Sequence, residues 1–312
     1  MDEKRQGMLW AAFAADALAL GAHWIYDPKV LRKRFERLEQ YVTPGSDSYH
    51  TGKSAGDLTH YGDQMLVLLE SVAACHGRFD LQDFARRWQN LFRNYTGYVD
   101  KATKATLQRF AEGYGPEASG SSSTDLAGAG RIAPVIYALW NDPKGCVAAA
   151  RAQTAMTHNN ATVVEAAAYW TVVTQEVLLG KHPEDALESA LQKLSLPEAF
   201  ASWVRHGLES AAMETEAAVL DFGQSCAADG AFPSVVHCIA RYANDLREGL
   251  IQNVMVGGDS AGRGLLVGMV LGAYHGFQAI PTEWIEKLLA GPKIRACVEQ
   301  IELARGQQVR PQ

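Results

Sequence analysis

Apolar residues recur at intervals of three and four along almost the whole chain, and this spacing restricts the fold more than any other feature. Such spacing places apolar side chains on one face of an α-helix, whereas a half-buried β-strand needs strict alternation, which is scarce here. We therefore predict a nearly all-helical protein. The expected helices cover 5–23, 28–39, 63–76, 80–93, 100–112, 129–140, 143–155, 160–179, 183–192, 197–220, 233–243, 245–252, 260–278 and 282–290.

The domain organisation follows from length and from the segments between these helices. A chain of 312 residues that is 47% hydrophobic can bury a large core, either in one large domain or in two ordinary ones. Clusters of Gly, Pro and Ser at 41–63, 113–130 and 225–233 separate the helices, and the first two are long enough to be typical of functional loops. No stretch is long or polar enough to link two domains. We predict a single helical domain over 1–312.

Charge and cysteine content exclude several classes of protein. Asp and Glu number 35 against 29 Lys and Arg, so we expect neither a nucleic acid nor a membrane partner. The five cysteines are widely spread and include no C-x-x-C pair, which favours free thiols in a reducing compartment. The alanine-rich run near the N-terminus is interrupted by Asp16 and is too short to span a bilayer. We expect a cytoplasmic protein.

The expected helix over 260–278 carries glycines at every fourth position, namely Gly264, Gly268, Gly272 and Gly276. Residues with this spacing share one helix face, and each glycine in a helix interior costs roughly 1 kcal/mol relative to alanine. The stripe therefore predicts very close packing of a neighbouring helix, for which the alanine-rich helix over 5–23 is suited.

Three acidic residues stand next to or within apolar helices. Asp259 in GGDSAGRG and Asp63 in HYGDQM each open an apolar run, and each alone is most simply an N-cap that accepts backbone N–H groups. Asp16 lies inside the apolar first helix, where an ionised carboxylate needs a metal ion, an arginine or several hydrogen bonds. If the three converge, their oxygens suit Mg²⁺ or a similar ion.

Two polar segments offer binding groups. Thr157 and His158 precede the expected helix over 160–179, whose free N–H groups suit a phosphate, although a capping turn explains the same residues. The small residues of 121–130 form a loop that a ligand could approach closely. The chain contains no G-x-S-x-G, H-E-x-x-H or P-loop motif, so those enzyme classes are not indicated.

Five stretches, in this order, resemble motifs of the ADP-ribosylglycohydrolase family: ADALALGAHWIYD, HYGDQM, STDLAGAGRIAP, MTHNNA and GGDSAGRG. The resemblance extends from about residue 8 to about residue 278. It implies an all-α orthogonal helical bundle with a central cleft, where Mg²⁺ and acidic residues cleave the glycosidic bond between ADP-ribose and a protein side chain.

The resemblance also implies site residues. Asp259 matches the first acid of the last motif, and Asp16 matches the acid of the first helix. We expect Asp16, Asp63 and Asp259 to be catalytic, with Asp63 and Asp259 also binding the metal ion. The expected substrate-binding residues are Ser123, Thr124, Gly128, Thr157, His158, Gly257, Gly258 and Arg263.

The motifs also depart from the family pattern. HYGDQM lacks the family's pair of adjacent acids, and Ala261 stands where the last motif has its second acid. Fewer carboxylates hold less divalent charge, so we expect at most one Mg²⁺, with Arg263 as a fixed positive charge beside the diphosphate. The pattern resembles the J-crystallin branch of the family more than its well-characterised hydrolases.

These observations predict a hydrolase that cleaves the N- or O-glycosidic bond of an ADP-ribosylated substrate or a related ADP-ribose-like compound. The alternative is a non-catalytic protein that binds ADP-ribose or a nucleotide, or that has a structural role as a crystallin does. A third possibility is hydrolysis of another ribosyl compound with histidine metal ligands such as His23, His60 and His158. Lone histidines are more often structural, so this ranks last.

Overall fold

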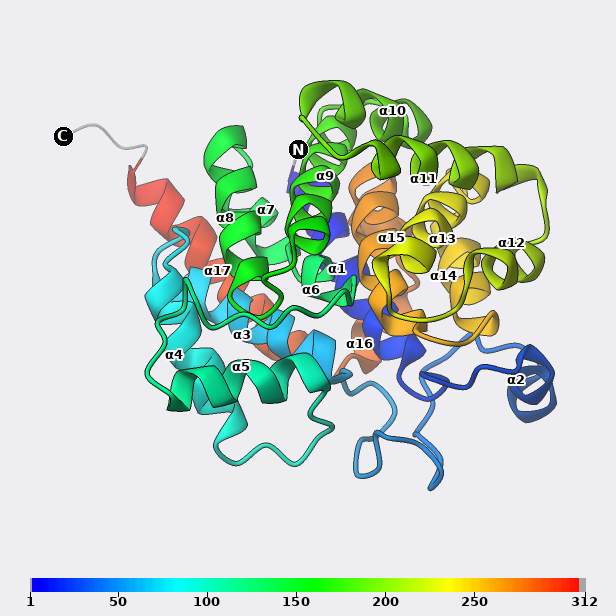
Figure 1. The fold of residues 1–312 in the computed structure, drawn as a ribbon, viewed down its shortest axis with the longest axis horizontal. Helices are drawn as coiled ribbons and strands as arrows, with labels where there is room; N and C mark the ends of the chain where they lie inside the picture. The colour runs from blue at the N-terminus through cyan, green and yellow to red at the C-terminus, as the bar shows by residue number, and fades with distance from the viewer. Residues whose placement is uncertain (1, 309–312) are drawn as a thin grey trace.

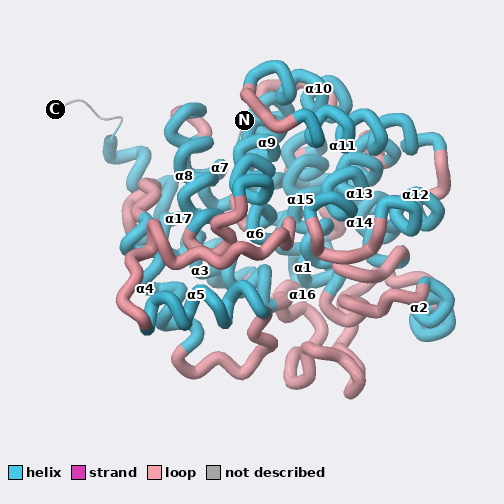
Figure 2. Tube along the Cα trace, viewed as in Figure 1, coloured by secondary structure: helices cyan, strands magenta, loops and turns pink. Residues whose placement is uncertain are grey.

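A computed structural model describes residues 2–308 as helices joined by loops, with no β-strand in that range (Figure 2). The all-α prediction is confirmed. The helices are α1 (Asp2–Ala19), α2 (Pro28–Phe35), α3 (His60–Ala74), α4 (Leu81–Phe92), α5 (Lys101–Ala111), α6 (Ala127–Gly130), α7 (Ala133–Leu139), α8 (Pro143–Ala155), α9 (Ala161–Leu178), α10 (Pro183–Lys193), α11 (Glu198–Glu209), η1 (Ser210–Ala212), α12 (Thr215–Phe222), α13 (Ala228–Arg241), α14 (Leu246–Met255), α15 (Ser260–His275), η2 (Phe277–Ala279), α16 (Thr282–Lys287) and α17 (Gly291–Gln308).

Helices α1 and α15 pack against each other in the middle of the molecule, where Figure 1 shows them in blue and orange. A Cβ atom added at Gly268 would lie 2.5 Å from the carbonyl oxygen of Ala11, and one at Gly272 would lie 2.3 Å from that of Gly7. Only glycine permits such an approach of two helix backbones. The predicted neighbour of the glycine stripe is confirmed, and its predicted role is confirmed at Gly268 and Gly272, whereas Gly276 lies past the end of α15.

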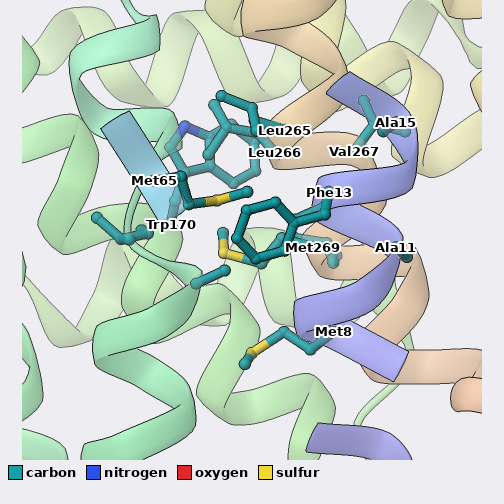
Figure 3. Close-up of a cluster of buried hydrophobic side chains, with 14 of the residues drawn as sticks. Met8, Ala11, Phe13, Ala15, Met65, Trp170, Leu265, Leu266, Val267 and Met269 are labelled. Atoms are coloured by element: carbon teal, nitrogen blue, oxygen red, sulfur yellow. The ribbon is translucent and has the colours of Figure 1, made fainter. Parts of the chain in front are cut away.

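The other helices surround this pair and share its hydrophobic core. Figure 3 shows Phe13 of α1, Met65 of α3, Trp170 of α9 and Leu266 of α15 in one cluster. All four side chains are fully buried, and the cluster extends into most of the remaining helices. This shared core supports the single domain predicted for residues 1–312, which stays a prediction. No helix within 2–308 has both the length and the apolar character needed to cross a bilayer.

Three predicted helices are interrupted. The helix predicted over 260–278 ends at His275, because Gly276 has a φ angle of 83°, and η2 follows it. The segment 197–220 divides into α11, η1 and α12, because the Ser210 hydroxyl donates to the carbonyl of Gly207 and the chain is extended at Met213. The segment 129–140 divides into α6 and α7 around Arg131, with a proline in the first turn of α7.

Other parts of the helix prediction were also wrong. Helix α13 begins at Ala228, inside the predicted loop over 225–233, so Pro233 lies within the helix and not at its start. The C-terminal helix α17 was not predicted, although it packs against α3 and buries Ile294 and Ile301. The predicted loops at 41–63 and 113–130 correspond to the connections 36–59 and 112–126. Tyr49 and Ser123, one from each connection, border the same cavity.

Candidate active site

Asp259 lies in a tight turn just before α15. Gly257 and Gly258 have φ angles of 78° and 66°, a conformation that favours glycine, and a Cβ atom at Gly258 would lie 2.3 Å from the carbonyl oxygen of Gln224. Asp259 occupies the N-cap position, yet its side chain accepts no backbone N–H. Its Oδ1 instead lies 2.6 Å from Nε2 of His23. The capping explanation for the Asp259 side chain is therefore wrong, and its partner is an imidazole.

Arg263 supports this turn from inside the protein. Its side chain is fully buried, and Nη2 donates to the carbonyl of Gly257 at 2.5 Å. The remaining contacts go to Asn253 and to the carbonyl of Gln224. Arg263 was predicted to lie beside a diphosphate, and this position conflicts with that role. Its guanidinium donates to oxygens of the protein itself, and no part of the side chain is exposed.

Asp16 is fully buried in α1 and holds the start of α3. Its two oxygens accept hydrogen bonds from Thr59, at 2.7 Å from the backbone nitrogen and 2.6 Å from the hydroxyl. Burial raises the pKa of Asp16 to about 6, against the opposing effect of the Thr59 hydrogen bonds. A metal ion, an arginine or several hydrogen bonds were the partners predicted for Asp16, and the structure shows hydrogen bonds.

Asp63 is in the first turn of α3, not at its N-cap, which is Thr59. Its Oδ2 accepts from the Lys53 ammonium at 2.6 Å and from the Tyr95 hydroxyl at 2.5 Å. Burial raises the pKa of Asp63 while the positive charge of Lys53 lowers it, with a net rise. The capping explanation for Asp63 is also wrong.

Three buried histidines lie together between these acids. Nδ1 of His23 lies 2.8 Å from Nε2 of His50, and the ring centroids of His23 and His60 are 6.0 Å apart. One nitrogen of each imidazole lies within 4.8 Å of the other two. The hypothesis of histidine metal ligands named His23, His60 and His158. In the structure the third histidine of the cluster is His50, from the connection 36–59.

A cavity of about 360 Å³ opens beside the histidines. Its lining is aromatic and acidic, and it consists of Trp24, Tyr26, Tyr49, Tyr61, Tyr98, Asp100, Lys101, Ala102, Ser123, Asp125 and Cys226. Trp24 contacts Tyr49 and Tyr98 edge-to-face, with centroid distances of 5.2 and 4.9 Å. Such a mixture of apolar rings and a few polar groups is typical of small-molecule sites.

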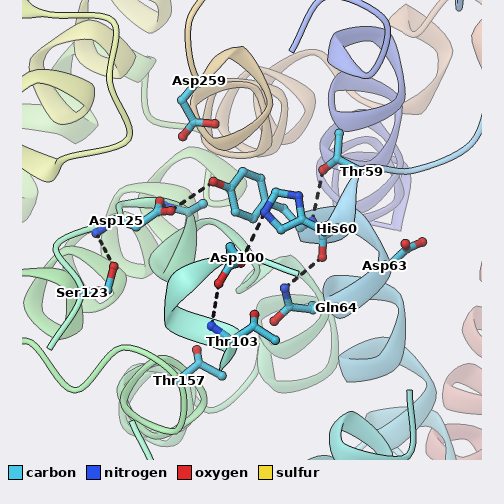
Figure 4. Close-up of polar contacts among 12 residues, drawn as sticks. Thr59, His60, Asp63, Gln64, Asp100, Thr103, Ser123, Asp125, Thr157 and Asp259 are labelled. Atoms are coloured by element: carbon cyan, nitrogen blue, oxygen red, sulfur yellow. Dashed lines mark hydrogen bonds and ion pairs between the residues drawn. The ribbon is translucent and has the colours of Figure 1, made fainter. Parts of the chain in front are cut away.

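The two acids of this cavity differ in their surroundings (Figure 4). Asp125 accepts from the Tyr61 hydroxyl at 3.0 Å and from a backbone nitrogen, while burial and then the charges of Asp259 and Asp100 raise its pKa well above the usual range. Burial also opposes ionisation of Asp100. The nearby His60, 3.3 Å away, and the backbone N–H of Thr103 lower the pKa of Asp100 more than burial raises it, so the net shift of this pKa is downward. Neighbouring acids with pKa values pushed apart are typical of acid–base sites.

Ser123 is the predicted substrate-binding residue that lines the cavity. Thr124, next to it, is exposed, and its carbonyl accepts from the backbone of Ala228. The predicted glycines act through the backbone: Gly128 packs against the ring of His158, where a Cβ atom would be 2.5 Å from the ring.

The predicted phosphate site at the start of α9 is closed. Asn160 caps this helix, and its side chain accepts from two of the free N–H groups. Thr157 and His158 are buried and bond to each other at 2.8 Å. The capping explanation fits this turn better than phosphate binding does.

The oxygens of Asp63 and Asp259 do not fit the magnesium site that the resemblance implies. A lysine ammonium neutralises Asp63, and an imidazole is bonded to Asp259, whereas Mg²⁺ prefers several free carboxylate or water oxygens. Figure 4 shows the Asp63 carboxylate on the far side of His60 and Thr59 from Asp259.

Comparisons with known proteins agree with this architecture. A family model described as ADP-ribosylglycohydrolase matches residues 1–311. The chain belongs to the ADP-ribosylglycohydrolase family. Crystallins J1A and J1B of Tripedalia cystophora are 20% and 22% identical to it, each over 96% of both chains. A solved ADP-ribosylglycohydrolase-related protein complex superposes with a TM-score of 0.76 at 23% identity, covering 97% of this chain and 98% of the other.

Membership of the ADP-ribosylglycohydrolase family supports a glycohydrolase-type function. Sequence reasoning missed three of the groups around the cavity. Asp125 lies two residues after Ser123 inside the STDLAGAGRIAP motif, so that motif could have identified it. Asp100 could only be recognised as the N-cap of α5, and His50 stands alone in a loop with no local signal.

Proposed function

We propose that this protein hydrolyses the N- or O-glycosidic bond of an ADP-ribosylated substrate or a related ADP-ribose-like compound in the cavity beside the histidines. The observation that carries the proposal is the pair of carboxyl groups, Asp125 and Asp100, that line one cavity in opposite protonation environments. Hydrolysis of glycosidic bonds commonly uses two carboxyl groups, one that donates a proton and one that is ionised.

The two acids have distinct roles in this proposal. Asp125 is buried beside other acids and can remain protonated, so it suits the general acid that donates a proton to the leaving atom. The carboxylate of Asp100 can orient water or face the positive charge that develops on the ribose ring. Ser123 and the aromatic rings offer one polar contact and flat surfaces for the sugar and the adenine.

The three acids expected to be catalytic contribute indirectly in this proposal. Asp259 positions His23, and Asp16 fixes Thr59 at the start of α3. Asp63 binds Lys53 and Tyr95, which joins the connection 36–59 to α3. We propose that all three are positioning residues for the cavity.

The crystallin relatives favour an alternative in which the cavity binds an ADP-ribose-like ligand without chemistry, or in which the protein has a structural role. Two measurements separate these possibilities. Thermal unfolding with added ADP-ribose reports binding, because a ligand that binds only the folded state raises the midpoint. Release of ADP-ribose from ADP-ribosylated peptides reports turnover.

The decisive variant is Asp125→Asn, which removes the acidic proton and keeps the shape of the side chain. We expect its turnover to fall by about 10²- to 10⁴-fold, the usual contribution of a general acid. Asp221→Asn, at an exposed position on α12, serves as the control and should match the wild type. Binding without turnover by the wild type would favour the non-catalytic alternative, and equal turnover by both variants would exclude Asp125 as the acid.

A further inference from the structure

We propose that His23, His50 and His60 bind one divalent transition metal ion of the zinc class. The proposal does not depend on the hydrolase proposal, since it concerns metal binding and not turnover. The three imidazoles come from the segment after α1, from the connection 36–59 and from the first residue of α3. One nitrogen of each already lies within 4.8 Å of the other two.

Neighbouring carboxylates orient two of the imidazoles as metal ligands, one through a hydrogen bond and one through an ion pair. Because Nε2 of His23 donates to Oδ1 of Asp259, its Nδ1 carries a lone pair, and this lone pair faces His50. On the other side, Nε2 of His60 lies 3.3 Å from Oδ2 of Asp100, which leaves Nδ1 as the second nitrogen. A carboxylate behind an imidazole is the usual support of a metal-binding histidine.

A second observation is the number of buried nitrogens without a partner. Nδ1 of His50 and Nδ1 of His60 have no hydrogen-bond partner among residues 2–308, and Nε2 of His60 has only its ion pair with Asp100, although all three histidines are at most 3% exposed. A buried polar atom without a partner is costly, and a metal ion bound to Nδ1 of His60 would satisfy one of these nitrogens.

The distances suit a single ion. Nitrogen ligands at 2.0–2.1 Å from a tetrahedral Zn²⁺ lie about 3.3 Å from one another. The 2.8 Å between the facing nitrogens of His23 and His50 is slightly shorter, and the third nitrogen needs to approach by about 1.5 Å or less to reach that spacing. On binding, His50 would carry its ring proton on Nδ1, so that Nε2 could turn its lone pair to the ion.

The donor set selects the class of ion. Imidazole nitrogens suit Zn²⁺, Co²⁺, Ni²⁺ or Cu²⁺, whereas Mg²⁺ and Ca²⁺ prefer oxygen. The carboxylates of Asp259 and Asp100, one behind each of two ligands, would balance the double positive charge. The three histidines therefore lie near the position where the family resemblance implies a magnesium site, but they would bind a different class of metal ion.

The test is a titration of the full chain with Zn²⁺ against a chromophoric chelator, followed by Co²⁺ and its visible absorption. We expect one ion per chain. His50→Gln should abolish this binding, and Asp259→Asn should weaken it by about 10- to 100-fold, the usual effect of losing a supporting carboxylate. His206→Ala, at an exposed position on α11, is the control and should bind as the wild type does.

Thermal unfolding without metal checks that each variant is folded. His50 is buried but lies in the connection 36–59, and glutamine keeps a polar side chain of similar size, so His50→Gln should unfold near the wild-type midpoint. Absence of stoichiometric Zn²⁺ and Co²⁺ binding by the wild type would overturn the proposal, and so would equal affinities of the His50→Gln and His206→Ala proteins. Neither result would bear on hydrolysis at Asp125, so failure of the two proposals can be told apart.

Discussion

The packing of α15 on α1 can be tested with two alanine substitutions in the same helix. In Gly268→Ala the new Cβ atom would lie 2.5 Å from the carbonyl oxygen of Ala11, about 1 Å closer than the ~3.5 Å at which non-bonded atoms attract. In Gly264→Ala the nearest atoms are Nδ2 of Asn253 at 3.2 Å and the carbonyl oxygen of Ala15 at 3.4 Å. Only the first substitution forces the two backbones apart.

The magnitudes follow from two opposing effects. Alanine stabilises a helix interior by about 1 kcal/mol relative to glycine, whereas overpacking costs about 1–3 kcal/mol and sometimes more. We expect Gly268→Ala to destabilise the protein by up to about 2 kcal/mol net, and Gly264→Ala to be neutral or slightly stabilising.

Thermal unfolding of the two variants, side by side with the wild type, measures the difference. About 2 °C per kcal/mol is expected for a chain of this size, so Gly268→Ala should melt a few degrees below Gly264→Ala. Equal midpoints, or a lower midpoint for Gly264→Ala, would refute the close approach of α1 and α15 on which the position of Asp259 depends.

Four further predictions concern stability and binding. Burial holds the pKa of His237 at about 4, below the 6.5 of a free imidazole. The contribution of neutral His237 to the free energy of unfolding is therefore complete above pH 6.5 and is lost as the pH falls toward 4, by at most about 3 kcal/mol. His237→Gln should flatten this fall in the free energy of unfolding. Arg263→Lys keeps the charge but loses the planar fork, and we expect a loss of about 3 kcal/mol in chemical denaturation, while a wild-type midpoint would contradict its role in the turn. Tyr49→Ala, at a side chain 63% exposed, should weaken ADP-ribose binding in calorimetry by about 1–3 kcal/mol without changing the melting midpoint, if the ring stacks on the adenine. Mg²⁺ should leave the melting midpoint unchanged because Lys53 already neutralises Asp63, and a rise with Mg²⁺ would restore the predicted oxygen site.

Much of the fold could be predicted because helical packing leaves a periodic signal. The stripe that includes Gly268 and Gly272 identified both a close helix pair and its members. Glycine at every fourth position destabilises an isolated helix, and close packing against a second helix offsets this loss. The interruption at Ser210 had no such signal, because a hydroxyl that bonds back to Gly207 resembles any serine on a helix.

The candidate site was harder to predict because its contacts join residues far apart in sequence. Asp259 was selected as an acid at a helix start, but its partner His23 lies 236 positions away and no local pattern connects them. His50 lies in a loop without periodicity, so only the folded chain shows that it meets His23 and His60. Asp125 was within a recognised motif but was overlooked beside Ser123.

The central claim is that an ADP-ribose-like compound binds in the cavity between the aromatic rings and the two acids. A crystal structure of the protein soaked with ADP-ribose tests it most directly. We predict electron density for the ligand against Trp24 and Tyr98, with the ribose carbon of the scissile bond facing Asp125. Density bound elsewhere on the protein, or a cavity that stays free of ligand at saturating ADP-ribose, would contradict the claim.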